Sequence, residues 1–176
     1  RMSVWVDAFL GVTDGRIAYI GKTAPEEKPE RILDGAGMVL MPGLVNCHTH
    51  LPMSLLRGYG EELPLSEWLS RSIFPQEERM DARSVKAAAL LSIAECLRFG
   101  VTSVSDMYFC SDAVAEAVAE SGIKANLCHA VTTDRTDDFD LDTDPDFHEA
   151  EALHDKWNGY DDGRIRIDCG IHAEYT

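Results

Sequence analysis

From residue 42 onward, short apolar runs alternate with longer amphipathic stretches, and this alternation constrains the fold more than any other feature of the chain. The apolar runs predict strands over residues 44–47, 101–105, 123–131 and 165–170, and apolar residues at helical spacing predict helices over 83–98, 112–121 and 147–157. Strands that alternate with helices of this length form βα units on a parallel sheet. The sequence therefore predicts an α/β fold with about four such units.

Residues typical of helix ends support these boundaries. Asp81 is placed to cap the first helix, Gly100 lies just past its end, and Ser111 is the predicted cap of the second helix. The pair Asn158-Gly159 closes the third helix. The six aspartates between 132 and 145 predict an exposed loop before that helix.

Residues 1–41 show short runs rich in Val and Ile that are interrupted by turn residues. They are predicted to form a small β-segment, separate from the βα segment 42–176. The pair Asp14-Gly15 precedes an alternating run and favours a tight hairpin. Extended pattern resumes in two further runs, 31–33 and 37–40. Because Arg1 stands in a strand-like run, we expect the natural N-terminus to lie elsewhere.

Composition excludes several classes of partner. The chain has 16 Lys and Arg against 31 Asp and Glu, a net charge of -15, and such a surface repels nucleic acid and anionic membranes. No apolar run approaches the roughly 18 residues of a membrane span, and the first residues lack the order of a signal peptide. The five cysteines form an odd set without a CxxC pair, as expected of reduced thiols in a cytoplasmic protein.

The strongest motif is the run Pro42-Gly43-Leu44-Val45-Asn46-Cys47-His48-Thr49-His50. Because side chains alternate along a strand, His48 and His50 point to the same side at its carboxyl end, where active sites of parallel sheets collect. Two imidazoles on one side suit a divalent metal ion, zinc above all. The alternative is a chance pair in a surface strand, but the buried character of the preceding run favours metal binding.

Three further features would lie near this edge of the sheet. His172 follows the fourth strand and either faces the site or is a hydrogen-bonded core histidine. Glu77, in the long segment after the first strand, either serves the site or is simply solvated. On the same segment, Trp68 and Met53 either wall an apolar pocket or pack on the helices.

Taken together, the run 42–53, the pieces Leu56-Arg57-Gly58 and Pro75-Gln76-Glu77, and the segments 100–102 and 106–108 resemble the amidohydrolase superfamily. Within it, the chain is most similar to the branch of 5-methylthioadenosine/S-adenosylhomocysteine deaminases and their chlorohydrolase and guanine deaminase relatives. The resemblance covers nearly the whole chain. It implies a (β/α)8 barrel together with a small β-sandwich built from both chain ends.

The resemblance also implies roles for four residues. His48 and His50 would be two ligands of one zinc ion, Glu77 would bind the ribose hydroxyls, and His172 would contact the substrate base. The third histidine ligand, the glutamate of an HxxE motif and the metal-binding aspartate would all lie beyond Thr176, so no catalytic residue is assigned within the chain. This agrees with its 176 residues, fewer than the roughly 250 of a closed barrel. Relatives are usually dimers, so a homo-oligomer is expected.

Three departures refine the expectation. Glu174 stands where many relatives have proline, which places an extra charge near the pocket. The arginines that bind homocysteine in relatives have no evident counterpart here, Arg135 being the only cation in that region. This favours 5'-methylthioadenosine or adenosine as the substrate over S-adenosylhomocysteine. Residues 164–176 contain no lysine that could bridge two metals, which favours a single ion. We therefore expect a zinc-dependent hydrolytic deaminase of an adenosine-type nucleoside. The alternatives are a triazine or guanine-type amidohydrolase, and a catalytically incomplete fragment or half-barrel that needs a partner.

Overall fold

A computed structural model describes residues 3–132 and 140–170. The chain separates into two compact units, Arg1–Met41 and Pro42–Thr176, and each is considered by itself. Within the described ranges, no helix combines the length and apolar character that crossing a membrane would require.

The first unit is built on a β-hairpin. Strands β1 (Phe9–Thr13) and β2 (Arg16–Gly21) pair antiparallel. The turn residues Asp14 and Gly15 both have positive φ, as in the tight hairpin predicted for this pair. The runs 31–33 and 37–40 form no strand, and every described residue of this unit is at least partly exposed to solvent. A strand is stable only when its backbone groups are paired, and no partner for these runs is present among the described residues.

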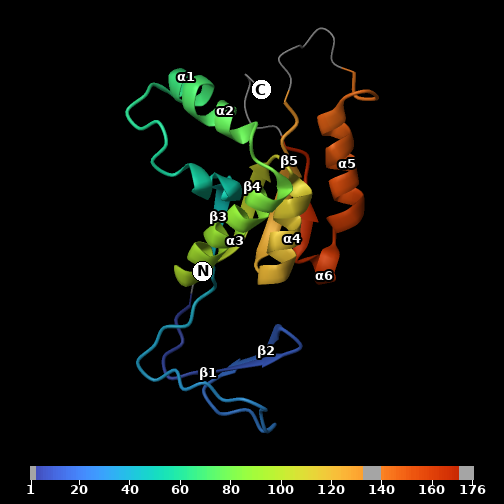
Figure 1. Ribbon diagram of the computed structural model, residues 1–176. Coiled ribbons are helices and arrows are strands. Elements are labelled where there is room, and N and C mark those ends of the chain that lie inside the picture. Colours follow the sequence, from blue (N-terminus) through green and yellow to red (C-terminus); the bar gives the residue numbers. More distant parts are fainter. Residues whose placement is uncertain (1–2, 133–139, 171–176) are drawn as a thin grey trace. The chain divides into compact units, whose positions relative to one another are not determined.

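The second unit contains a parallel sheet in the order β3-β4-β5-β6, and Figure 1 labels the first three of these strands. Its strands are β3 (Leu44–Thr49), β4 (Val101–Tyr108), β5 (Lys124–His129) and β6 (Ile165–Ile167). The predicted α/β character and parallel sheet are thus confirmed. β4 is three residues longer than predicted, β5 is shorter, and β6 ends at Ile167, followed only by an isolated bridge between Ala130 and Gly170.

Three long helices connect the strands and cover one face of the sheet. They are α3 (Ala82–Arg98), α4 (Ser111–Ser121) and α5 (Pro145–Trp157), and the short helix α6 (Tyr160–Gly163) follows α5. Their apolar residues pack with alternate residues of the strands in one core cluster that includes Ile93, Val114, Leu127, Leu153 and Ile165. The helices therefore hold the sheet from one side, as the apolar periodicity of the sequence requires.

The helix starts agree only in part with the predicted caps. Asp81 caps α3 in a reciprocal capping box with Ser84, as predicted. The prediction for Ser111 was wrong, because Cys110 occupies the cap position of α4 in a left-handed conformation and Ser111 is the first helical residue. The hydroxyl of Ser111 instead lies 2.9 Å from Nδ1 of the buried His129. A tertiary hydrogen bond has thus replaced the local one that the sequence suggested.

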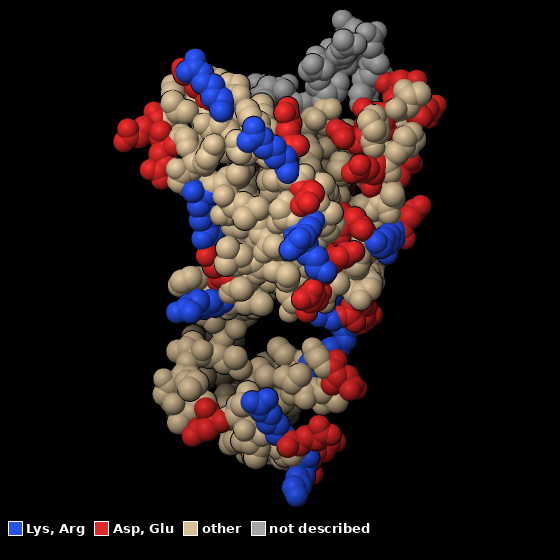
Figure 2. Space-filling view, in the orientation of Figure 1, with Lys and Arg blue, Asp and Glu red and all other residues tan. Residues whose placement is uncertain are grey.

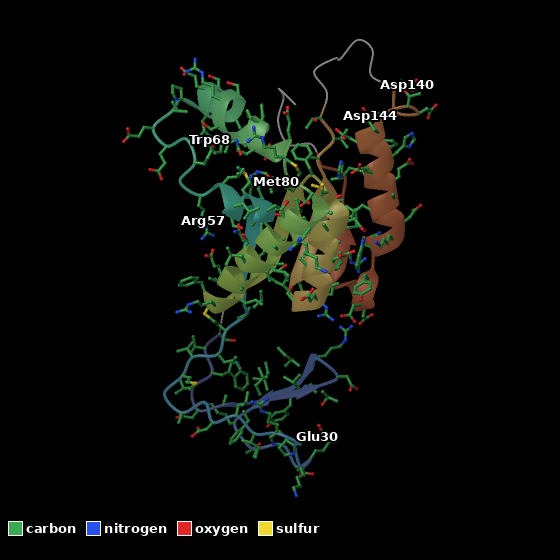
Figure 3. All side chains as sticks on the ribbon, in the orientation of Figure 1. Glu30, Arg57, Trp68, Met80, Asp140 and Asp144 are labelled. Carbon is green, nitrogen blue, oxygen red and sulfur yellow. The ribbon has the colours of Figure 1, made fainter. Side chains whose placement is uncertain are left out.

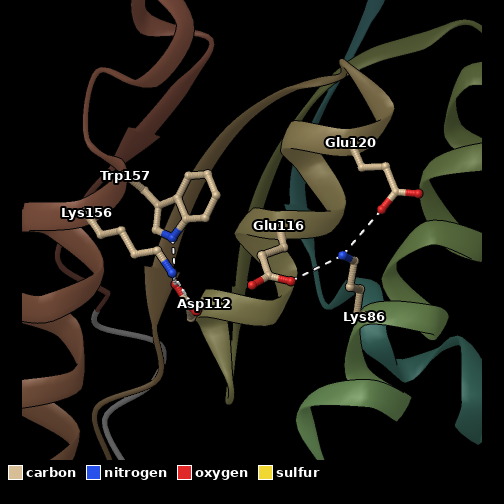
Figure 4. Close-up of polar contacts among 6 residues, drawn as sticks. All are labelled: Lys86, Asp112, Glu116, Glu120, Lys156 and Trp157. Carbon is tan, nitrogen blue, oxygen red and sulfur yellow. Dashed lines mark hydrogen bonds and ion pairs between the residues drawn. The ribbon is translucent and has the colours of Figure 1, made fainter.

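Ion pairs on the outer surface join α4 to both neighbouring helices (Figure 4). Lys86 of α3 lies 3.2 Å from Glu116 and 3.3 Å from Glu120. On the other side, Asp112 accepts hydrogen bonds from Lys156 and from the indole of Trp157, both on α5. Figure 2 shows acidic side chains interspersed with basic ones over this face, in keeping with the net charge of -15. Each exposed pair contributes little stability on its own.

The segment between β3 and α3 is folded into short helices rather than an open loop. It consists of a 3-10 helix η1 (Leu51–Leu56), a single turn α1 (Leu65–Glu67), a π-helix η2 (Trp68–Ile73) and α2 (Phe74–Glu77). Met80 then brings the chain back to the carboxyl end of β4 (Figure 3). This segment carries Glu77 to the edge of the sheet where β3 ends.

Gly43 allows the start of β3 to lie close to β4, so a larger residue at this position should destabilise the fold. A Cβ atom on Gly43 would lie 2.0 Å from Oγ1 and 2.7 Å from Cβ of Thr102, a side chain that is stiff because it is β-branched. We expect Gly43→Ala to lower the free energy of unfolding by roughly 1–3 kcal/mol, measured by urea denaturation. Gly35→Ala is the control, because its added Cβ would meet nothing within 4 Å. The double variant G43A/T102G should recover most of the loss, and an unchanged midpoint for G43A would contradict the close approach.

Candidate metal and substrate site

Two histidines meet at the carboxyl end of β3. His48 lies within β3, and His50 follows it directly at the start of η1. Their Nε2 atoms are 3.2 Å apart, and the rings stand edge to face with centroids 4.9 Å apart. The strand end thus brings the same ring nitrogen, Nε2, of both imidazoles within hydrogen-bond distance of each other.

The ring of His50 is oriented by the neighbouring strand. Its Nδ1 atom lies 2.7 Å from the carbonyl oxygen of Met107 in β4. Because a carbonyl oxygen only accepts, Nδ1 carries the proton and donates it, and a neutral imidazole then has its lone pair on Nε2. Metal-binding histidines are commonly held in this way, with the other ring nitrogen donating to a backbone carbonyl.

The geometry of the pair fits a zinc ion. Two nitrogens bound to one tetrahedral zinc at about 2.0–2.1 Å lie roughly 3.3 Å apart, close to the spacing of the two Nε2 atoms. Two imidazoles supply half of a tetrahedral ligand set. Within residues 3–132 and 140–170, no group of three or more His, Cys, Asp or Glu side chains is arranged to hold a metal ion. His48 and His50 could thus contribute two ligands of a site that needs others.

A buried carboxylate holds the backbone on both sides of His50. Asp106 of β4 is only 3% exposed, and its Oδ1 atom accepts a hydrogen bond from the Thr49 hydroxyl and another from the Leu51 amide, both at 2.7 Å. Burial raises the pKa of Asp106 to about 6, while these two hydrogen bonds act in the opposite direction. The bonds fix the point at which β3 turns into η1, and with it the direction of the His50 side chain.

Glu77 reaches the same edge of the sheet through Tyr108. The Tyr108 hydroxyl donates to Oε1 of Glu77 at 2.7 Å, and the Tyr108 ring lies 6.4 Å from the His50 ring between centroids. Burial and the Glu77 carboxylate both raise the pKa of Tyr108 above its ordinary value, so its hydroxyl keeps its proton. Tyr108 thus binds the Glu77 carboxylate and also lies close to the His50 ring.

Of the four site residues predicted from the sequence, the structure brings three to one edge: His48, His50 and Glu77. His172 lies outside the described residues. Trp68 uses its indole nitrogen to donate to the carbonyl oxygen of Tyr59, within the segment that follows β3.

Sequence reasoning assigned no role to Asp106 or Tyr108, although both stand in a quoted motif. For Asp106 a signal was available: a charged residue in an apolar strand is buried, and a buried charge needs hydrogen-bond partners.

The model of the amidohydrolase family matches residues 39–176. A 5-methylthioadenosine/S-adenosylhomocysteine deaminase of Thermoanaerobacter pseudethanolicus is 39% identical over 160 residues, which are 91% of this chain and 36% of the relative. The chain thus spans little more than a third of that relative's length.

Two solved structures are also similar. An adenosine deaminase from Xanthomonas campestris with bound zinc has a TM-score of 0.71 at 32% identity, covering 95% of this chain and 38% of that one. A triazine hydrolase from Arthrobacter aurescens has a TM-score of 0.79 at 25% identity, covering 93% and 41%. The family match over most of the chain confirms the resemblance carried by the histidine motif: the chain belongs to the amidohydrolase family.

Proposed function

We propose that this chain is part of a zinc-dependent hydrolytic deaminase that acts on an adenosine-type nucleoside, such as 5'-methylthioadenosine or adenosine. The observation that carries the proposal is the pair of Nε2 atoms 3.2 Å apart at the carboxyl end of a parallel strand. The deaminase from Thermoanaerobacter and the zinc-containing adenosine deaminase from Xanthomonas support the reaction and the metal.

Each residue at the edge has a part in this proposal. His48 and His50 hold a single zinc ion, which when bound supplies the activation of water for attack on the carbon that bears the amino group. Glu77 binds the sugar hydroxyls, and His172 contacts the base. Both act by orienting the nucleoside so that this carbon faces the metal. The remaining metal ligands and the group that moves the proton come from outside the described residues.

The architecture proposed for the enzyme follows from the same family. Residues 42–176 form the first half of a (β/α)8 barrel, and residues 1–41 belong to a small β-sandwich. The parallel order of β3 to β6, with helices as connections, supports the barrel. The exposed apolar residues Ile32, Leu33, Val39 and Leu40 support a first unit that is covered in the complete enzyme.

Ammonia release by the intact, zinc-supplemented enzyme is the direct test. The substrates are 5'-methylthioadenosine, S-adenosylhomocysteine, adenosine, guanine and a chlorotriazine. We expect ammonia from at least one adenosine compound and none from guanine, and a chelator should abolish the activity until zinc is restored. The triazine hydrolase with a TM-score of 0.79 makes triazine hydrolysis the second candidate. Chloride release from the triazine, without ammonia from any nucleoside, would replace the first proposal with this one.

A further inference from the structure

Tyr108 is the side chain that connects Glu77 to the sheet. It is the last residue of β4 and is only 4% exposed. Its hydroxyl donates to Oε1 of Glu77 at 2.7 Å, and the sulfur of Met80 lies 3.7 Å away. A buried tyrosine hydroxyl needs a hydrogen-bond partner, and the carboxylate is a far stronger acceptor than the thioether. The hydroxyl therefore holds Glu77 in one orientation.

This bond engages only one of the two carboxylate oxygens. Within the described residues, no hydrogen bond to Oε2 of Glu77 is present, and the side chain is half-buried rather than exposed. An ionised carboxylate can accept hydrogen bonds at both oxygens. With Oε1 held by Tyr108, Oε2 remains able to accept a hydrogen bond from a hydroxyl donor.

From this arrangement, and resting on the deaminase function proposed above, we propose that Tyr108 is a positioning residue that sets the preference for substrates with sugar hydroxyls. Its hydroxyl fixes the direction of Glu77. Its ring lies 6.4 Å from the ring of His50 between centroids, and so helps to set the distance between Glu77 and the histidine pair. Without the Tyr108 hydroxyl, the carboxylate proposed to bind the sugar hydroxyls would lose the contact that orients it.

Tyr108→Phe in the intact enzyme tests this directly, because phenylalanine keeps the buried ring and removes only the hydroxyl. Adenosine and 2',3'-dideoxyadenosine are compared. We expect the KM for adenosine to rise by up to about tenfold, the effect of losing the bond between a sugar hydroxyl and the carboxylate once Glu77 is no longer held in place. The kcat for adenosine, the KM for the dideoxynucleoside and the zinc content should stay unchanged. Tyr160→Phe is the matched control, since Tyr160 is half exposed and packs on Trp157 away from the site.

A double-mutant cycle separates positioning from packing. In the Glu77→Gln background, Y108F should add little to the KM for adenosine, because the two residues act as one unit. Equal losses on both nucleosides, an additive cycle or an unchanged KM for adenosine would each overturn the role of Tyr108.

Binding of inosine and 2',3'-dideoxyinosine, measured by calorimetry, keeps this test independent of turnover. We expect the wild-type enzyme to bind inosine more tightly and Y108F to lose that preference. If the preference is present and depends on Tyr108 but no nucleoside is deaminated, the proposed function fails while the role of Tyr108 stands. If adenosine is deaminated but the wild-type enzyme does not prefer inosine, the role of Tyr108 fails alone.

Discussion

Replacing His50 with alanine is expected to remove bound zinc and deaminase activity together. The imidazole supplies one of the two Nε2 atoms that lie 3.2 Å apart, and no other described side chain stands ready to take its place. Loss of a partner that merely orients a metal ligand costs roughly 10–100-fold in metal affinity, so loss of the ligand itself should exceed that range. The measurements are zinc content after dialysis and the rate of ammonia release.

The control for this experiment is His154→Ala. His154 is an exposed histidine near the end of α5, so its loss tests whether removal of any imidazole lowers zinc binding. His48→Ala should behave like His50→Ala. Retention of stoichiometric zinc by either site variant would refute the assignment of that residue as a ligand.

Replacing Asp106 with alanine is expected to weaken both the fold and the metal site. The change leaves the buried Leu51 amide without its acceptor, whereas the Thr49 hydroxyl can still donate to the Ser105 carbonyl oxygen 3.0 Å away. The unsatisfied buried amide and the weakened Thr49 contact should together lower the free energy of unfolding by about 2–4 kcal/mol, measured by urea denaturation. Because the turn that directs His50 also loosens, we expect zinc affinity to fall by roughly 10–100-fold.

Asp106→Asn distinguishes geometry from charge. Both hydrogen bonds end on Oδ1, and an amide oxygen can accept both, so D106N should retain most of the stability and zinc affinity that D106A loses. Asp155→Ala is the surface control, since the Asp155 side chain is 88% exposed. Zinc binding by D106A at wild-type affinity would show that Asp106 supports the fold without orienting His50.

Features that depend on neighbours in sequence could be predicted from the chain alone. The strand that ends in His48 and the helix capped by Asp81 follow from alternation, from helical periodicity and from the reach of a short side chain to the next backbone amides. The alternation rule also places His48 and His50 on one side, and their Nε2 atoms do meet. Their role as zinc ligands stays a proposal.

Features that depend on tertiary partners could not be predicted. The Ser111 hydroxyl bonds His129, which is 18 residues away, and Tyr108 bonds Glu77, which is 31 residues away. No local pattern signals either partner. The extended runs in residues 31–40 show the same dependence, because a strand forms only where a second strand pairs with it and no such partner is present among the described residues.

Three consecutive residues of β4 each hold a different part of the site. Asp106 binds the backbone around His50, the Met107 carbonyl binds the His50 ring, and Tyr108 binds Glu77. The scaffold of the candidate site is therefore a tripeptide on β4, a strand that carries neither His48 nor His50. Anyone who transplants the histidine motif into another parallel sheet would need to carry this tripeptide on the adjacent strand, in register, for the grafted imidazoles to keep their aim.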